Sequence, residues 1–169
     1  MPKAKASNPK PTARPDEVEA GVVGVFAEAV RILGLPPSVG SIYGVFFASS
    51  LPLSMDDVVK RLGISKGSAS QGLRLLRQFG ALRPVTHGSG RREYYVANTE
   101  LRKVVGGFLR TELLPQMEKG VRATNRLAVL AEAHPDPARR KTLVERLAKL
   151  AAWQRRGQQV LSLVERFLD

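Results

Sequence analysis

Two amphipathic runs between residues 54 and 78 form the clearest pattern of apolar and polar positions in the chain. In residues 54–62 and again in residues 66–78, apolar side chains recur every three to four positions, as they do on one face of a helix. Gly63 lies between the runs and supplies the backbone freedom that a tight turn needs. The pattern therefore predicts two short helices joined by a turn.

Both predicted helices begin at a residue that can cap them. Ser54 and Ser65 stand at N-cap positions, where a hydroxyl oxygen accepts a hydrogen bond from a backbone N–H group of the first turn. Asp57 follows Ser54 at the spacing of a capping box. Ile64, inside the turn, is expected to be buried. These signals support a helix-turn-helix and locate its boundaries.

A β-hairpin is predicted after the second helix. Residues 81–87 and 92–97 have the composition of two short strands, and Gly88-Ser89-Gly90 between them suits a hairpin turn. Arg91 and Arg92 then stand at or near the tip, placed to enter a minor groove or to clamp its phosphates. An exposed pair without a partner is the alternative. A helix-turn-helix followed by such a wing is a module that reads DNA.

The outward face of the second helix carries the chemistry that such a module needs. If Leu73 marks the inward face, Ala69 and Leu76 lie beside it. The outward positions are then Gly67, Ser68, Gln71, Arg74 and Gln78. Small side chains allow close approach to a groove, glutamine can pair with adenine, and arginine can pair with guanine. An ordinary solvated helix face is the alternative interpretation.

Charge points to a polyanionic partner. Ser65, Lys66 and Ser68 lie at a helix N-terminus, where backbone N–H groups and the helix dipole favour a phosphate. Residues 54–97 contain eight basic and three acidic residues, and the whole chain has a net charge of +12. Binding to nucleic acid releases counterions from its phosphates and so favours a basic protein. A merely soluble basic surface is the alternative.

Two helices are predicted before the module, over residues 16–33 and 38–50. Residues 16–53 are expected to form core, either within the chain or shared with a partner subunit. An aromatic stripe in the second of these helices is interpreted as packing rather than as a ligand cage. Residues 1–15 hold four basic residues, four prolines and no acid, and are expected to be a disordered basic arm. The arm is either a solubilising tail or a source of weak phosphate contacts.

Residues 98–169 are predicted to form long amphipathic helices. Asn98 is expected to cap the first, and Pro115 to kink or break it near residues 113–114. Asp136-Pro137 marks the start of the last helix, which carries a heptad-like apolar seam. This much apolar surface predicts a dimerisation region. Packing within the chain alone is the alternative.

The sequence lacks the residues that several classes of function require. The chain has no cysteine, which excludes thiol catalysis, disulfides and thiolate metal sites and fits a reducing cytoplasm. His87 and His134 are the only histidines, and neither belongs to a pattern typical of catalysis or metal binding. No glycine-rich phosphate loop, signal peptide or membrane-spanning run is predicted. We therefore expect neither an enzyme, nor a bound cofactor or metal, nor a membrane protein.

The sequence resembles the MarR-type winged-helix transcription regulators, and especially the GbsR-like branch that includes the glycine-betaine-synthesis repressor. The resemblance extends over roughly residues 20 to 130. Its motifs are Gly34-Leu-Pro-Pro-Ser-Val-Gly-Ser-Ile-Tyr-Gly44, Leu62-Gly-Ile-Ser-Lys-Gly-Ser-Ala-Ser70 with Leu73-Arg74, Phe79-Gly80, and Gly90-Arg-Arg-Glu-Tyr-Tyr95.

The resemblance implies a mainly α-helical fold with a small β-hairpin wing, that is, a winged helix-turn-helix with long flanking dimerisation helices. It implies a cytoplasmic homodimer that binds double-stranded operator DNA, usually as a repressor, and is commonly released by a small-molecule effector. By position it assigns groove contacts to Ser65 through Arg74, Ser70 included, and wing contacts to Arg91 and Arg92. The pair Arg77-Gln78 departs from the family, in which acids are frequent here. A non-regulatory or architectural DNA-binding protein without an effector is the alternative.

Overall fold

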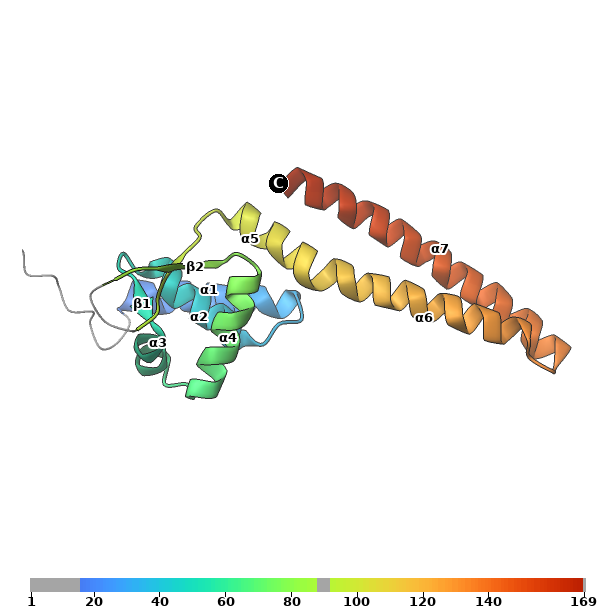
Figure 1. Ribbon diagram of the computed structural model, residues 1–169, viewed down its shortest axis with the longest axis horizontal. Coiled ribbons are helices and arrows are strands. Elements are labelled where there is room, and N and C mark those ends of the chain that lie inside the picture. The colour runs from blue at the N-terminus through green and yellow to red at the C-terminus, as the bar shows by residue number, and fades with distance from the viewer. Residues whose placement is uncertain (1–15, 88–91, 169) are drawn as a thin grey trace, which may run out of the picture. The chain divides into compact units, whose positions relative to one another are not determined.

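The computed structural model describes residues 16–87 and 92–168, and these divide into two compact units at Thr99/Glu100. The first unit contains the elements α1 (Glu17–Ile32), α2 (Pro37–Ala48), β1 (Leu53–Ser54), α3 (Met55–Leu62), α4 (Lys66–Gln78), β2 (Leu82–Val85) and β3 (Tyr94–Ala97). The second contains α5 (Leu101–Phe108), the π-helical turn η1 (Leu109–Leu113), α6 (Leu114–Glu132) and α7 (Pro137–Leu168). Figure 1 shows this mainly helical chain and its small sheet. The winged-helix fold with long additional helices is confirmed.

The turn between α3 and α4 forms as its capping residues predict. The Asp57 carboxylate accepts a hydrogen bond from the Ser54 N–H group at 2.9 Å, and the Ser54 hydroxyl oxygen accepts one from the Asp57 N–H group at 3.4 Å. The capping box is therefore complete. Gly63 ends α3 in the left-handed conformation, with φ of 64°, which glycine adopts without steric strain. Ser65 caps α4 by accepting from the Ser68 N–H group at 3.1 Å.

The wing is part of a three-stranded antiparallel sheet with the strand order β1-β3-β2. Leu53 of β1 pairs with Tyr95 of β3, while β2 and β3 form the predicted hairpin with shorter strands than expected. Pro84 lies in β2, an edge strand, where a residue without an N–H group is tolerated. Strand β1 was not predicted, because two residues carry no alternating pattern and their pairing depends on β3 being in place.

The core of the first unit is built around α2. The apolar pattern of this helix predicts an inward side of Val39, Ile42, Tyr43, Phe46 and Phe47; the first four are buried, and Phe47 is only partly buried. Phe26 of α1 contacts the Tyr43 ring edge to face, with centroids 4.8 Å apart, so the aromatic stripe is indeed packing. Val45 of α2 is buried as well, and the rest of this core follows α2 in the chain: Leu53, Val58, Ala69, Leu73, Leu76, Phe79, Ala81, Leu82 and Tyr95.

Glycines on α2 and α4 allow the helices of the first unit to approach closely. A Cβ atom at Gly40 would lie 2.1 Å from the Phe26 carbonyl oxygen, and one at Gly44 would lie 2.7 Å from the Val23 Cα atom. A Cβ atom at Gly72 of α4 would lie 2.4 Å from the Ile42 Cδ1 atom. At Gly40 and Gly44 a larger residue would collide with the backbone of α1, so the close approach of α1 and α2 depends on glycine; at Gly72 the atom met is the end of the flexible Ile42 side chain, which can shift.

Helix α1 has apolar residues on two faces, and only one face packs on α2. No α1 residue is fully buried, and Val18, Val25 and Ile32 are 75%, 67% and 89% exposed. The expectation that residues 16–53 form core therefore holds for α2, while the outer face of α1 is open in the single chain. A largely buried ion pair between the Glu19 and Arg61 side chains connects α1 to α3.

The second unit begins differently from the sequence prediction. Asn98 does not occupy the N-cap position, because α5 begins at Leu101 and the N-cap is Glu100. The Asn98 side-chain amide donates to the Gly80 carbonyl at 3.2 Å instead. Of the predicted kink or break near residues 113–114, the break does not occur, because the backbone angles stay helical through Leu113 and Leu114. The chain passes through the wider π-helical turn η1, and α6 follows with helical angles at Leu114, φ −61° and ψ −44°. A π-helical turn is one way for a helix to absorb a local disruption of its hydrogen bonding.

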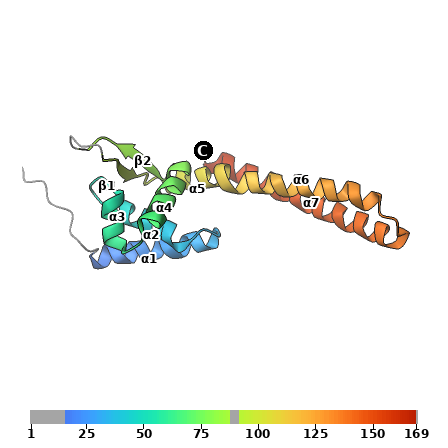
Figure 2. The same cartoon turned by 60° about the horizontal axis from the view of Figure 1, so that its bottom comes forward.

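Helices α6 and α7 lie side by side in an antiparallel hairpin, which both views in Figures 1 and 2 show. The Asp136 carboxylate accepts hydrogen bonds from the Ala138 and Arg139 N–H groups, at 2.9 and 3.3 Å, which confirms the predicted start of α7. Large apolar side chains nevertheless remain exposed on this hairpin. They include Leu127, Leu130, Trp153, Val160, Leu163 and Phe167. None of the helices in the described ranges is long and apolar enough to span a bilayer.

Candidate nucleic-acid interface

Helix α4 presents the face that its sequence predicts. Ala69, Leu73 and Leu76 are buried against the rest of the first unit. The predicted outward residues are all exposed: Gly67, Ser68, Gln71, Arg74 and Gln78. Ser70, assigned by resemblance, is exposed as well. The orientation of α4 thus follows the pattern of its apolar residues, and an amide and a guanidinium lie on its open side.

The first turn of α4 combines a capping interaction with an exposed, weakly paired lysine. The Ser65 hydroxyl is engaged, because it accepts from the Ser68 N–H group and donates to the Ser68 hydroxyl oxygen at 3.1 Å. Lys66 lies 4.0 Å from the Asp56 carboxylate, and its side chain is 75% exposed. An ion pair this long and exposed contributes little energy, so the lysine ammonium group is available to another anion.

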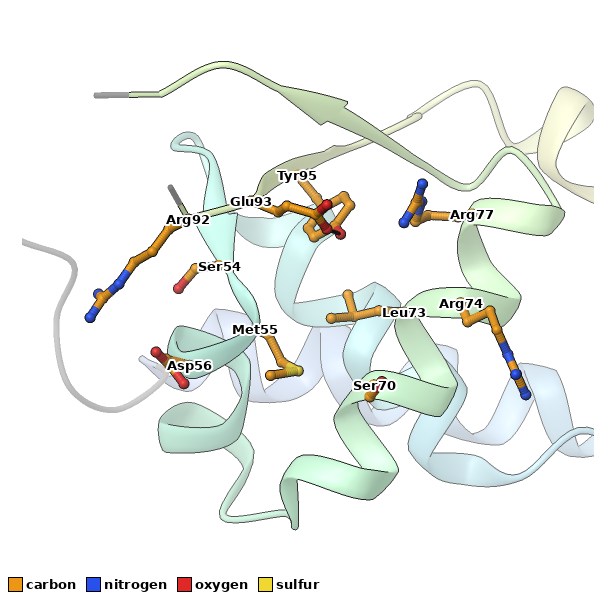
Figure 3. Close-up of a pocket in the computed structure, with 10 residues that line it drawn as sticks. All are labelled: Ser54, Met55, Asp56, Ser70, Leu73, Arg74, Arg77, Arg92, Glu93 and Tyr95. Carbon is orange, nitrogen blue, oxygen red and sulfur yellow. Dashed lines mark hydrogen bonds between the residues drawn. The ribbon is translucent and has the colours of Figure 1, made fainter. Parts of the chain in front are cut away.

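A cleft of about 430 Å³ lies between α4, the start of α3 and the wing (Figure 3). It is lined by Ser54, Met55, Asp56, Ser70, Leu73, Arg74, Arg77, Arg92, Glu93 and Tyr95. The structure therefore brings three of the predicted site residues, Ser70, Arg74 and Arg92, to one cleft. Arg91 and the hairpin tip lie outside the described residues.

Tyr95 has three side-chain partners at the wing side of this cleft. The guanidinium carbon of Arg77 lies 5.6 Å from the centre of the Tyr95 ring, a cation–π contact. The Tyr95 hydroxyl donates a hydrogen bond to the Glu93 carboxylate. On α2, the Phe46 ring meets the Tyr95 ring at 90° with centroids 6.4 Å apart. Burial, followed by this hydrogen bond to Glu93, raises the pKa of Tyr95.

Sequence reasoning missed the part that Arg77 and Tyr95 play here. Arg77 was noted only as a departure from the family, and Tyr95 only as a strand residue. Arg77 lies one turn after Arg74, so helical spacing alone indicates that the two have neighbouring directions. No sequence signal could have linked Arg77 to Tyr95, since their contact depends on how the hairpin packs on α4.

The two histidines have local partners. The His87 ring contacts the Tyr94 ring with centroids 4.9 Å apart, and the His134 Nδ1 atom accepts a hydrogen bond from the Asp136 N–H group at 3.2 Å. Over residues 16–87 and 92–168, no three acidic or histidine side chains gather in a way that could hold a metal ion.

Comparison with known proteins supports the architecture. The chain is similar in fold to a solved protein described as a transcriptional regulator. The match has a TM-score of 0.57 and 19% sequence identity, and it covers 89% of this chain and 97% of the other. At this identity the match establishes a shared fold over nearly the whole length of both chains. No protein-family model matches the sequence, and no curated protein matches it significantly.

Proposed function

We propose that this protein is a cytoplasmic, sequence-specific DNA-binding transcription regulator of the MarR type, in the GbsR-like branch, and that it acts as a homodimeric repressor. The observation that carries the proposal is the convergence of α4 and the wing. Ser70 and Arg74, both exposed on α4, border one cleft together with Arg92 of the wing. The similarity in fold to a protein described as a transcriptional regulator supports the same conclusion.

The exposed groups of α4 suggest how the helix would read DNA. Gln71 and Arg74 would contact base edges in a major groove, where each can form paired hydrogen bonds. Gly67 leaves room for the groove wall, and Gln78 extends the same face. Lys66 would contact phosphate, together with the backbone N–H groups of the helix start near Ser65 and Ser68. Arg91 and Arg92 would bind the adjacent minor groove or its phosphates.

A homodimer would explain the apolar surface that the single chain leaves open. Trp153 and Phe167 of α7 are 70% and 79% exposed. Large apolar side chains of this kind, lying along one long helix, are typical of a surface that a partner covers. A second copy of the chain is the proposed partner, because two-fold dimers match the two half-sites of an operator.

Selection of bound fragments from random DNA tests the proposed function. The expected result is an enriched sequence with two related half-sites, bound at least a thousandfold more tightly than unrelated DNA at the same salt concentration, as is typical of specific regulators. A panel of metabolites added to the bound complex would then identify an effector that releases the DNA. Equal affinity for enriched and unrelated fragments would favour the alternative, an architectural protein that uses its basic charge without reading sequence.

A further inference from the structure

Arg77 belongs to the same helix as the proposed DNA contacts but faces a different partner. In Figure 3, Arg77 extends from α4 toward the wing, whereas Arg74 points away from Tyr95. The Arg77 guanidinium lies 5.6 Å from the centre of the Tyr95 ring. The Tyr95 hydroxyl in turn donates to Glu93, which directly follows Arg92 in the chain. One contact thus connects α4 with the strand that leads to the wing arginines.

The wing needs such a contact to keep a defined position. Strands β2 and β3 have four residues each, and an isolated two-stranded hairpin of this size is marginally stable in water. On its buried side, Tyr95 packs against Phe46, and its strand pairs with the two residues of β1. Arg77 covers the side that faces the cleft and joins the wing to α4 itself.

We propose that Arg77 is a positioning residue: it sets the wing relative to α4 through Tyr95, and so acts on DNA affinity without contacting a phosphate. The inference rests on the proposed DNA-binding function. Both Arg77 and Lys66 are exposed, but the Arg77 guanidinium already has an aromatic partner in Tyr95 and therefore has less to gain from a phosphate than Lys66 has. Basic residues at the two ends of α4 would therefore contribute to affinity in different ways, and the two contributions differ in their dependence on salt.

The salt dependence of binding separates the two roles. A lost phosphate contact lowers the slope of log affinity against log salt concentration by about one, whereas a lost positioning contact leaves the slope unchanged. We expect Arg77→Met to weaken binding by roughly two- to fivefold, the equivalent of one exposed cation–π contact, with the wild-type slope. Lys66→Ala is the comparison variant, for which the slope should fall. A reduced slope for Arg77→Met would overturn the proposal.

A double-mutant cycle tests whether Arg77 acts through Tyr95. If Arg77 acts through Tyr95, the effects of Arg77→Met and Tyr95→Leu on DNA affinity will not add, because either change removes the same contact. Additive effects would show that Arg77 acts elsewhere. Because Tyr95 is buried, Tyr95→Phe, which keeps the ring, is the variant to use if the leucine protein does not fold; it should leave the effect of Arg77→Met unchanged.

Hydrogen exchange in the free protein tests the role of Arg77 independently of DNA binding. Amide hydrogen exchange of Tyr94 and Val96 in the free protein should be about two- to fivefold faster in Arg77→Met than in the wild type, since local opening becomes easier by the energy of the lost contact. Arg83→Met is the matched control: Arg83 is exposed on β2 and does not line the cleft. Unchanged exchange in Arg77→Met would contradict the positioning role. If the wild-type protein binds no DNA, the proposed function is wrong. The exchange experiment would still show whether the contact between Arg77 and Tyr95 stabilises the wing.

Discussion

The Arg61 guanidinium of α3 donates a hydrogen bond of 2.7 Å to the Glu19 carboxylate of α1, and the two side chains are only 8% and 12% exposed. The residues are 42 positions apart in sequence. The ion pair therefore connects the N-terminal helix to the module that we propose binds DNA.

Removing one partner of this pair should destabilise the first unit strongly. Glu19→Gln leaves the Arg61 charge buried without its carboxylate, and we expect a loss of about 3 kcal/mol in the free energy of unfolding, measured by urea denaturation. The matched control is Glu28→Gln, which removes the exposed Arg31–Glu28 pair and should cost less than about 0.5 kcal/mol. Similar losses in the two variants would contradict the importance of burial at Glu19.

Two glycine substitutions should have opposite effects on stability. Gly40→Ala places a Cβ atom 2.1 Å from the Phe26 carbonyl oxygen, so α1 and α2 must separate, and we expect a loss of about 1–3 kcal/mol. Gly24→Ala on α1 meets nothing within 4 Å and should stabilise the protein by up to about 1 kcal/mol through helix propensity. Thermal unfolding of both variants measures the difference. A stable Gly40→Ala protein would show that the helices are less closely packed than described.

Substitutions on α4 and on the wing should affect DNA binding in different ways. Gln71→Ala or Arg74→Ala should weaken binding to the selected operator by about 1–3 kcal/mol and leave unrelated DNA almost unaffected, because base contacts carry specificity. Arg92→Ala, and likewise Arg91→Ala, should weaken both, because phosphate and groove contacts there are largely independent of sequence. Gel shifts at fixed salt make the comparison. If all of these variants bind as the wild type does, the DNA-binding assignment is wrong.

The exposed apolar face of α7 should govern oligomeric state. We expect the wild-type chain to sediment as a dimer, and Trp153→Ser or Phe167→Ser to weaken association by about 1.5–3 kcal/mol each, as expected for the loss of a buried apolar side chain. Gln159→Ser, an exposed polar position on the same helix, is the control and should leave the dimer intact. Analytical ultracentrifugation over a range of concentrations distinguishes these outcomes, and a monomeric wild-type protein would refute the proposed homodimer.

Alkaline stability should depend on Tyr43. Its hydroxyl donates to the Asn98 carbonyl at 2.7 Å, and burial raises the pKa of Tyr43 from 10.0 to about 12. Between these pH values the unfolded chain releases the phenolic proton while the folded chain keeps it. The unfolded state then binds fewer protons, so the free energy of unfolding falls as pH rises through this window, by about 2–3 kcal/mol in total.

Urea unfolding at a series of pH values from about 9 to 12 measures this loss. Tyr43→Phe is the reference variant: it should be less stable at neutral pH by about 1 kcal/mol, because the Asn98 carbonyl loses its donor, and its stability should fall less steeply above pH 10. The difference in pH dependence between the two proteins gives the contribution of Tyr43 alone, because both proteins contain the other tyrosines. Equal slopes would contradict the raised pKa.

Some contacts that organise the first unit could not be predicted. The Tyr43–Asn98 hydrogen bond joins residues 55 positions apart, and the Glu19–Arg61 pair joins residues 42 apart. Capping and helical periodicity relate residues within about one turn, so they carry no information on such pairs. The same limit explains the missed strand β1 and the wrong expectation for Asn98, whose side chain bonds to Gly80 once the hairpin has closed.

The sequence by itself determined the local elements: α3, the Gly63 turn and α4, with Ala69, Leu73 and Leu76 inward and Gln71 and Arg74 outward. It could do so because capping hydrogen bonds and the apolar stripe of a helix both arise from residues a few positions apart. Only the tertiary structure decided that Arg77 meets Tyr95 and that Arg92 shares a cleft with Arg74. It alone decided, too, that one face of α1 remains open. These relationships depend on how separate elements pack, and packing is set by the shape of the whole core rather than by any single segment.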